Sequence, residues 1–258
     1  MNLSLSGRRA IVCGSTSGIG RACAQLLAER GASVVLAARD EEKLISTVNS
    51  LDGDDHSYIC ADFNDPENLR LKTIDHINKT GVIHILMNNS GGPPGGPLIE
   101  ANPDEFEIAF KRHVISSHIL TQAVVPGMKE KGYGRIINII STSVNQVIPG
   151  LGVSNTIRGA VAQWVKTLAI ELGPYGITAN NVLPGYIDTD RLKNLLEKSA
   201  KDKNITYDQM VTETEKKTSL GRIGLPTEVA SAVAFIASEA GGYISGTNFS
   251  VDGGRFGI

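Results

Sequence analysis

The chain has 258 residues, of which 41% are hydrophobic, and its formal net charge is -2 at pH 7. This size suits one α/β domain with a sizeable core, and the small net charge gives no indication of a nucleic-acid partner. No apolar run approaches the ~18–20 residues that cross a bilayer, and we expect no signal peptide and no membrane association. The three cysteines lack metal-ligand spacing, which favours reduced thiols in a cytoplasmic protein without a metal site.

Apolar β-rich runs alternate with helical periods along the whole chain. Continuous apolar runs such as RIINII are typical of strands buried on both faces of a parallel sheet. The alternation predicts right-handed crossovers and a single, doubly wound α/β domain, with about seven mostly parallel strands and helices on both faces. The predicted strands are Arg9–Cys13, Ser33–Ala38, Tyr58–Ala61, Ile83–Asn88, Gly134–Ser141, Thr178–Leu183 and Asn248–Val251. The predicted helices are Gly18–Arg30, Glu41–Leu51, Pro66–Lys79, Pro103–Lys131, Asn155–Leu172 and Pro226–Ala237.

Two segments interrupt this alternation. Gly91–Pro97, with the sequence GGPPGGP, is predicted to be a loop because it follows a strand and contains mainly glycine and proline. The segment from Asp190 to Thr218 is charged and weakly helical, and it lies between two ordered elements. We interpret it as a lid-like insertion over a site, with a solvated surface hairpin as the alternative.

A glycine-rich turn joins the first predicted strand directly to a helix. Glycines at such a turn allow the backbone to approach a pyrophosphate closely, and the helix N-terminus supplies free N–H groups. Because the turn lies at the first strand–helix junction of a βαβ unit, it predicts a dinucleotide site in a Rossmann fold. The residues expected to bind the cofactor here are Gly14, Ser15, Thr16, Ser17, Gly18, Ile19 and Gly20.

The end of the second strand indicates which dinucleotide is bound. A carboxylate at this point binds both ribose hydroxyls of NAD(H) and repels a 2′-phosphate. Ala38 stands where that acid is expected, and the guanidinium of Arg39, the next residue, suits a phosphate. We therefore predict that NADP(H) is preferred and that NAD(H) is possible. In the alternative, Arg39 lies on the surface and Asp40 binds the ribose of NAD(H).

These motifs together resemble the short-chain dehydrogenase/reductase family, and most closely its 3-oxoacyl-acyl-carrier-protein reductase-like members. The markers extend over essentially the whole chain and include Asn88–Gly91, Pro184-Gly185 and the closing run Val251–Gly254. The resemblance implies a homo-oligomer, a tetramer or dimer built through the two long helices. It also implies that Asp62 and Phe63 hold the adenine, Asn89 and Gly91 the adenosine ribose, and Ile187 and Thr189 the nicotinamide amide.

The catalytic tetrad of the family, Asn, Ser, Tyr and Lys, is degenerate in this chain. Ser141 matches the Ser. Ser154 stands at the Tyr position, Arg158 at the Lys position and His113 at the Asn position. Arg158 is expected to bind the nicotinamide ribose and to favour an anionic oxygen. An aliphatic hydroxyl is much less acidic than a phenol, so Ser154 is a poor proton donor unless another group moves its proton.

The proton donor is therefore open at this level. His113 falls where the family holds a relay water, and histidine ordinarily titrates near neutrality. Tyr186 directly follows Pro184-Gly185 and is expected beside the nicotinamide pocket. His113, Tyr186 or water could each deliver the proton, although packing roles for both side chains are the alternative.

Two functions fit these observations. The first is an NADP(H)-dependent oxidoreductase that interconverts a carbonyl and an alcohol with Ser141, Ser154, Arg158, His113 and Tyr186 as candidate catalytic residues. The alternative is an NADP(H)-binding protein without efficient redox activity, such as a sensor or an assembly partner. A dehalogenase is disfavoured, because the glycine motif is kept while the Tyr is lost. The apolar content of Thr142–Leu151 suggests a partly apolar small-molecule substrate.

Overall fold

The computed structural model describes residues 2–255, which fold around one seven-stranded parallel sheet with the strand order β3-β2-β1-β4-β5-β6-β7. The order reverses between β1 and β4, and this switch point is where doubly wound sheets bind their ligands. The predicted fold class is confirmed. The strands are β1 Arg9–Cys13, β2 Ser33–Ala38, β3 Ser57–Cys60, β4 Ile85–Asn88, β5 Gly134–Ile139, β6 Ile177–Pro184 and β7 Asn248–Val251.

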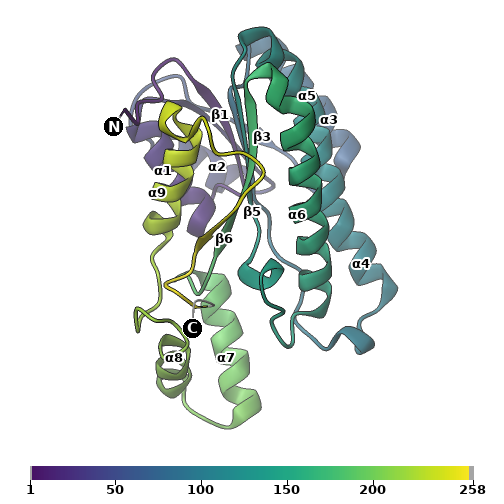
Figure 1. The fold of residues 1–258 in the computed structure, drawn as a ribbon, viewed down its shortest axis with the longest axis vertical. Coiled ribbons are helices and arrows are strands. Elements are labelled where there is room, and N and C mark those ends of the chain that lie inside the picture. The colour runs from purple at the N-terminus through teal and green to yellow at the C-terminus, as the bar shows by residue number, and fades with distance from the viewer. Residues whose placement is uncertain (1, 256–258) are drawn as a thin grey trace.

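Helices cover both faces of the sheet, with α1 and α9 packed together on one face and α3, α5 and α6 on the other (Figure 1). The sheet divides the hydrophobic core into two layers, as alternate residues of β2 show. Val34 and Leu36 belong to one buried cluster, whereas Val35 and Ala37 belong to the other, because successive side chains of a strand point to opposite faces. The helices bounding these layers are α1 Gly18–Glu29, α2 Glu41–Val48, α3 Pro66–Thr80, α4 Pro103–Phe110, α5 Ser116–Lys131, α6 Gly152–Leu172 and α9 Pro226–Ala237.

The predicted helix Pro103–Lys131 is one continuous helical segment, but a π-helical turn interrupts its α-helical repeat. This turn, Lys111–Ile115, separates α4 from α5 and contains His113, which is buried. A π turn inserts one extra residue into the helical repeat and rotates the side chains that follow it. The prediction of one uninterrupted helix is therefore wrong at these five residues.

The segment predicted to be weakly helical forms two well-defined helices, α7 Asp190–Lys203 and α8 Tyr207–Glu215. Thr189 caps α7 by accepting a hydrogen bond from the backbone N–H of Leu192 at 3.3 Å. Leu196, Ala200 and Met210 form a small buried cluster between the two helices. Figure 1 shows this hairpin projecting beyond the end of the sheet at which β6 leads into α7.

Within residues 2–255, every helix is too short or too polar to span a bilayer.

Candidate active site

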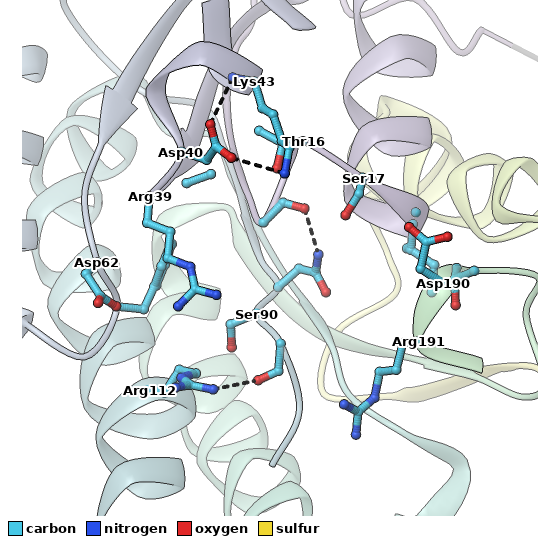
Figure 2. Close-up of a pocket in the computed structure, with 18 of the residues that line it drawn as sticks. Thr16, Ser17, Arg39, Asp40, Lys43, Asp62, Ser90, Arg112, Asp190 and Arg191 are labelled. Carbon is cyan, nitrogen blue, oxygen red and sulfur yellow. Dashed lines mark hydrogen bonds and ion pairs between the residues drawn. The ribbon is translucent and has the colours of Figure 1, made fainter. Parts of the chain in front are cut away.

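A cavity of about 470 Å³ opens at the carboxyl ends of β1, β2 and β4, the switch point of the sheet (Figure 2). Its walls come from segments far apart in sequence, because the carboxyl ends of neighbouring parallel strands meet at one edge. Those segments are the β1–α1 turn, the end of β2, the loops after β3 and β4, and the start of α7. The predicted residues that line it are Gly14, Thr16, Ser17, Gly18, Ile19, Arg39, Asp62, Phe63, Asn89, Gly91 and Thr189.

The glycine turn is shaped for close backbone contact. Gly14 and Gly18 have φ angles of 58° and 51°, a region that favours glycine. A side-chain carbon at Gly20 would overlap the carbonyl oxygen of Gly14, so only glycine fits there. Asn89 closes the turn from the side, because its Nδ2 donates to the carbonyl oxygen of Cys13 at 3.3 Å.

The N-terminus of α1 faces this cavity and fits a phosphate group. Ser17 precedes the helix in an extended conformation, and no side chain in the described part of the chain accepts from the first-turn N–H groups. By contrast, Asp40, Asp65 and Thr189 each cap the helix that follows them. The free N–H groups and the positive end of the helix dipole suit a pyrophosphate. Ser15 does not reach the cavity, because its side chain is fully buried.

Arg39 and Asp40 have different roles at the adenosine end of the cavity. Asp40 accepts a hydrogen bond from the backbone N–H of Lys43 at 3.1 Å, and its carboxylate lies 3.1 Å from Nζ of Lys43. The first of these contacts lowers the pKa of Asp40 most, and the Lys43 side chain adds to it. Arg39 extends into the cavity, as Figure 2 shows. Asp40 is thus occupied as a helix cap, while Arg39 remains available for a phosphate.

The residues expected around the adenine, the adenosine ribose and the nicotinamide divide into two groups. Asp62 and Thr189 line the cavity. Ile187 does not, because its side chain is 5% exposed and belongs to the core that packs against α1 and α9. Ile187 lines a different cavity, and its carbonyl oxygen accepts from Oγ1 of Thr189 at 3.2 Å.

Arg158 is a buried cation held by a backbone carbonyl. It lies one turn after Ser154 on α6, and the two side chains are 8% and 7% exposed. Nη1 of Arg158 donates to the carbonyl oxygen of Ile139 at 3.0 Å. Burial lowers the pKa of Arg158 to about 10, and the charge of Arg191 contributes to the shift. The guanidinium therefore remains charged at neutral pH.

His113 is held in the neutral state. Its Nδ1 lies 2.7 Å from Oγ of Ser90, and its Nε2 is buried without a hydrogen-bond partner among residues 2–255. Burial lowers the pKa of His113 to about 2, and the charges of Arg158, Arg112 and Arg191 add to this effect. The expectation that His113 titrates near neutrality is therefore wrong, because a protonated imidazole here would be desolvated beside three cations.

A second, very small cavity joins His113 to Arg158. It has a volume of about 10 Å³, which is roughly the space of one water, and Ser90 and Asn138 also line it. Ser141 follows the cavity-lining Asn138 by three positions in sequence. It caps the 3₁₀ helix Thr142–Val144, and its side-chain oxygen accepts a hydrogen bond from the backbone N–H of Ser143 at 3.1 Å. The structure thus brings His113 and Arg158 together, whereas Ser141 and Ser154 line neither of these two cavities.

Tyr186 lines neither the main cavity nor the small cavity beside His113. It lines another cavity, of about 300 Å³, together with Leu220 and Gly224. The guanidinium carbon of Arg255 lies 4.0 Å from the centre of the Tyr186 ring. Tyr186 and the pair of His113 and Arg158 therefore face different cavities.

Sequence reasoning missed Ser90, Arg112 and Arg191. Ser90 is part of the run Asn88–Gly91 that marks the family resemblance, and Arg191 follows the predicted nicotinamide contact Thr189 by two positions, so both carried a positional signal. Arg112 donates from Nε to Oδ1 of Asn64 at 3.1 Å and lines the main cavity. Nothing in the sequence indicates that the Arg112 side chain points toward the main cavity. No cluster of potential metal ligands occurs within the described residues.

The fold and the dinucleotide cavity define the class, an NAD(P)-dependent short-chain oxidoreductase. The family model described as enoyl-(acyl carrier protein) reductase matches residues 14–255, and the chain belongs to the short-chain dehydrogenase/reductase family. The chain is similar to the 3-oxoacyl-[acyl-carrier-protein] reductase FabG of Vibrio cholerae serotype O1. The two are 33% identical over 254 residues, which cover 98% of this chain and 99% of that one.

Solved structures agree with the cofactor prediction. L-sorbose reductase from Gluconobacter frateurii, in complex with NADPH and L-sorbose, matches with a TM-score of 0.92 and 27% identity, covering 100% of both chains. The 3-ketoacyl-(acyl-carrier-protein) reductase from Brucella melitensis, in complex with NADH, matches with a TM-score of 0.85 and 28% identity, covering 98% of this chain and 99% of that one. Neighbours with both dinucleotides are consistent with NADP(H) preferred and NAD(H) possible.

Proposed function

We propose that this chain is an NADP(H)-dependent oxidoreductase of a carbonyl/alcohol pair in which a fixed cation replaces the titrating Tyr–Lys pair. The observation that carries the proposal is the state of Arg158. Its guanidinium is buried, is aimed by one hydrogen bond to the carbonyl oxygen of Ile139, and forms no ion pair with any carboxylate of residues 2–255. A preorganised cation of this kind stabilises negative charge that develops on a reacting oxygen.

The dinucleotide, when bound, supplies or accepts the hydride. Arg158 favours the alkoxide that forms on the substrate oxygen, and the hydroxyl of Ser141, which is partly exposed, donates a hydrogen bond to it. The Ser141 oxygen already accepts from Ser143, which leaves its O–H free to donate. His113 is neutral over the working pH range and Tyr186 faces another cavity. The proton therefore comes from water, for which the small cavity beside His113 has room.

The hairpin of α7 and α8 acts as a lid, since the first residues of α7 line the main cavity. The chain acts in the cytoplasm as a homo-oligomer that pairs through α4–α6. This face carries an apolar hollow of about 560 Å³ in which Phe110 is 42% exposed. The substrate is a partly apolar small molecule.

The first test follows the loss of NADPH absorbance over a panel of ketones, aldehydes and oxoacyl thioesters. We expect turnover at about 1 s⁻¹ or more with a suitable carbonyl. The variant R158M should lose about 10²–10³-fold in kcat, which is the usual loss on removing one stabiliser of an oxyanion. The variant S141A should also lose turnover, and unchanged rates in either variant would remove that residue from the mechanism.

The alternative function, an NADP(H)-binding protein without efficient redox activity, is favoured by the neutral His113 and by the position of Tyr186 on another cavity. It predicts tight NADPH binding and no turnover by the natural protein. The double variant S154Y/R158K restores the family's acid and its partner. Activity that appears only in this variant supports the alternative, whereas turnover by the natural protein excludes it.

A further inference from the structure

Arg158 and Arg191 bring two positive charges to the region between α6, the start of α7 and the loop Gly91–Pro97. Arg191 lines the main cavity, and its Nη1 and Nη2 donate to the carbonyl oxygens of Gly92 and Pro93 at 3.2 and 3.1 Å. Arg158 is anchored in the same way on Ile139. Backbone carbonyls thus fix the direction of both guanidinium groups, and each group keeps further N–H donors for a ligand.

Gly92 leaves the space that Arg191 occupies. A side-chain carbon at Gly92 would lie 2.6 Å from Nη2 of Arg191, so any larger residue would displace the guanidinium. The loop is also fixed at its other end, where the backbone N–H groups of Gly96 and Gly152 bond across to Gly150 and Gly96 at 2.8 and 3.2 Å. The cation therefore lies against a constrained loop at the edge of the active site.

Neither charge is neutralised within the described residues. The ion pairs of residues 2–255 include neither Arg158 nor Arg191. Asp190 precedes Arg191, but Figure 2 shows Asp190 beside Ser17 and the Arg191 side chain extending away from it. The charge of Arg191 lowers the pKa of both Arg158 and His113, which shows that the cations act on one region. Arg158 is buried, and a desolvated cation without a counter-charge is costly. Arg191 is exposed on the wall of the main cavity, where its unpaired guanidinium is accessible to a bound anion.

We infer that the substrate carries an acidic group, a carboxylate or a phosphate monoester, close to its carbonyl. Arg191 holds this group against the Gly91–Pro97 loop, while Arg158 faces the reacting oxygen. The planar fork of a guanidinium matches both anions with two parallel hydrogen bonds. The inference rests on the proposed function, since it names the substrate class of the same site.

The test compares acidic carbonyl compounds with their neutral counterparts. The pairs are 2-oxobutanoate with 2-oxobutanamide, acetoacetate with acetoacetamide, and dihydroxyacetone phosphate with dihydroxyacetone. For each pair, kcat/KM with NADPH is measured for the natural protein and for the variants R191Q, R191K and K193Q. Lys193 is the matched control, because it is an exposed cation on the same helix that does not line the cavity.

We expect the anionic member of at least one pair to be favoured about tenfold or more by the natural protein. The R191Q variant should lose that preference, R191K should keep part of it, and K193Q should keep all of it. The carboxylate and phosphate pairs tell the two acidic groups apart. A preference near one for every pair overturns the inference, as does a preference that survives R191Q. A rise confined to the KM for NADPH in R191Q also overturns it, because Arg191 would then serve the cofactor.

A binding measurement separates this inference from the proposed function. Tartrate, a dicarboxylate with no ketone, is added to the NADPH-saturated protein and the Tm is recorded. A rise in Tm with the natural protein that is lost in R191Q supports an anion site even if no carbonyl is turned over. If no carbonyl is turned over, absence of the rise in Tm overturns the anion site. If carbonyls are turned over without a charge preference, the inference is overturned while the proposed function stands.

Discussion

Replacing His113 with Asn should change how the stability of the protein depends on pH. His113 has a pKa of about 2 in the folded state and an ordinary value of 6.5. The unfolded chain therefore binds a proton at this residue below about pH 6.5, while the folded chain does not. Because the folded pKa is depressed, the stability linked to His113 is present above pH 6.5 and is lost as the pH falls toward 2.

The size of this loss follows from the difference in proton binding. Each pH unit between the two pKa values costs about 1.4 kcal/mol, so from about pH 7.5 to about pH 5 the natural protein should lose about 2 kcal/mol through His113. The variant H113N lacks this contribution. Its free energy of unfolding should therefore fall about 2 kcal/mol less over the same interval than that of the natural protein.

The assay is urea unfolding of both proteins at the two pH values. Any constant change caused by losing the contact between His113 and Ser90 cancels when each protein is compared with itself. The control variant is H118N, since His118 is exposed on the same helical path. Equal pH dependence in the natural protein and H113N would show that the imidazole titrates normally, and the argument for a neutral His113 would then be refuted.

Three further predictions follow from the cofactor site and its surroundings. The variant R39Q should raise the KM for NADPH about tenfold or more while changing the KM for NADH less than about twofold, because only NADPH carries the 2′-phosphate; steady-state kinetics with both cofactors checks this. The variant G20A should lose about 1–3 kcal/mol or more of stability, because its methyl group would overlap the carbonyl oxygen of Gly14. Its affinity for NADPH should fall as well. Calorimetry measures the loss of stability, and NADPH fluorescence titration measures the loss of affinity. The variant Y186F should keep kcat within about twofold, since its hydroxyl faces another cavity, and a loss of about 10² would make Tyr186 a proton donor after all.

The fold was predictable because its main signals are local. The bounds of β1, β2, β7 and α9 agree with the sequence prediction, since continuous apolar runs end sharply at polar or glycine residues. The π turn at Lys111–Ile115 was not predictable, because it changes the helical repeat without changing which residues are apolar. The two helices of the 190–218 segment were missed because their apolar contacts, centred on Leu196 and Met210, are made with each other and leave each helix largely charged.

The site was predictable in position but not in its electrostatics. The glycine turn and Arg39 lie where the motif placed them, because the motif is defined by the backbone geometry it must adopt. The pKa of His113 depends on its burial and on three arginines from different elements, and no spacing in the sequence reveals that convergence. The separation of Tyr186 from the site depends on which way one side chain turns after Pro184-Gly185.

Under the proposed function, the replacements predicted for the tetrad amount to one change from a titrating group to a fixed charge. With His113 neutral above about pH 2 and Arg158 charged below about pH 10, neither residue changes its charge across the range in which the protein works. A general acid or base with a pKa inside that range produces a bell-shaped rate profile, whereas a fixed cation does not. We therefore expect kcat to vary less than about threefold between about pH 5.5 and about pH 8.5 with a good substrate. The S154Y/R158K variant should regain a slope within that range, and a bell-shaped profile in the natural protein would show that another titrating group delivers the proton.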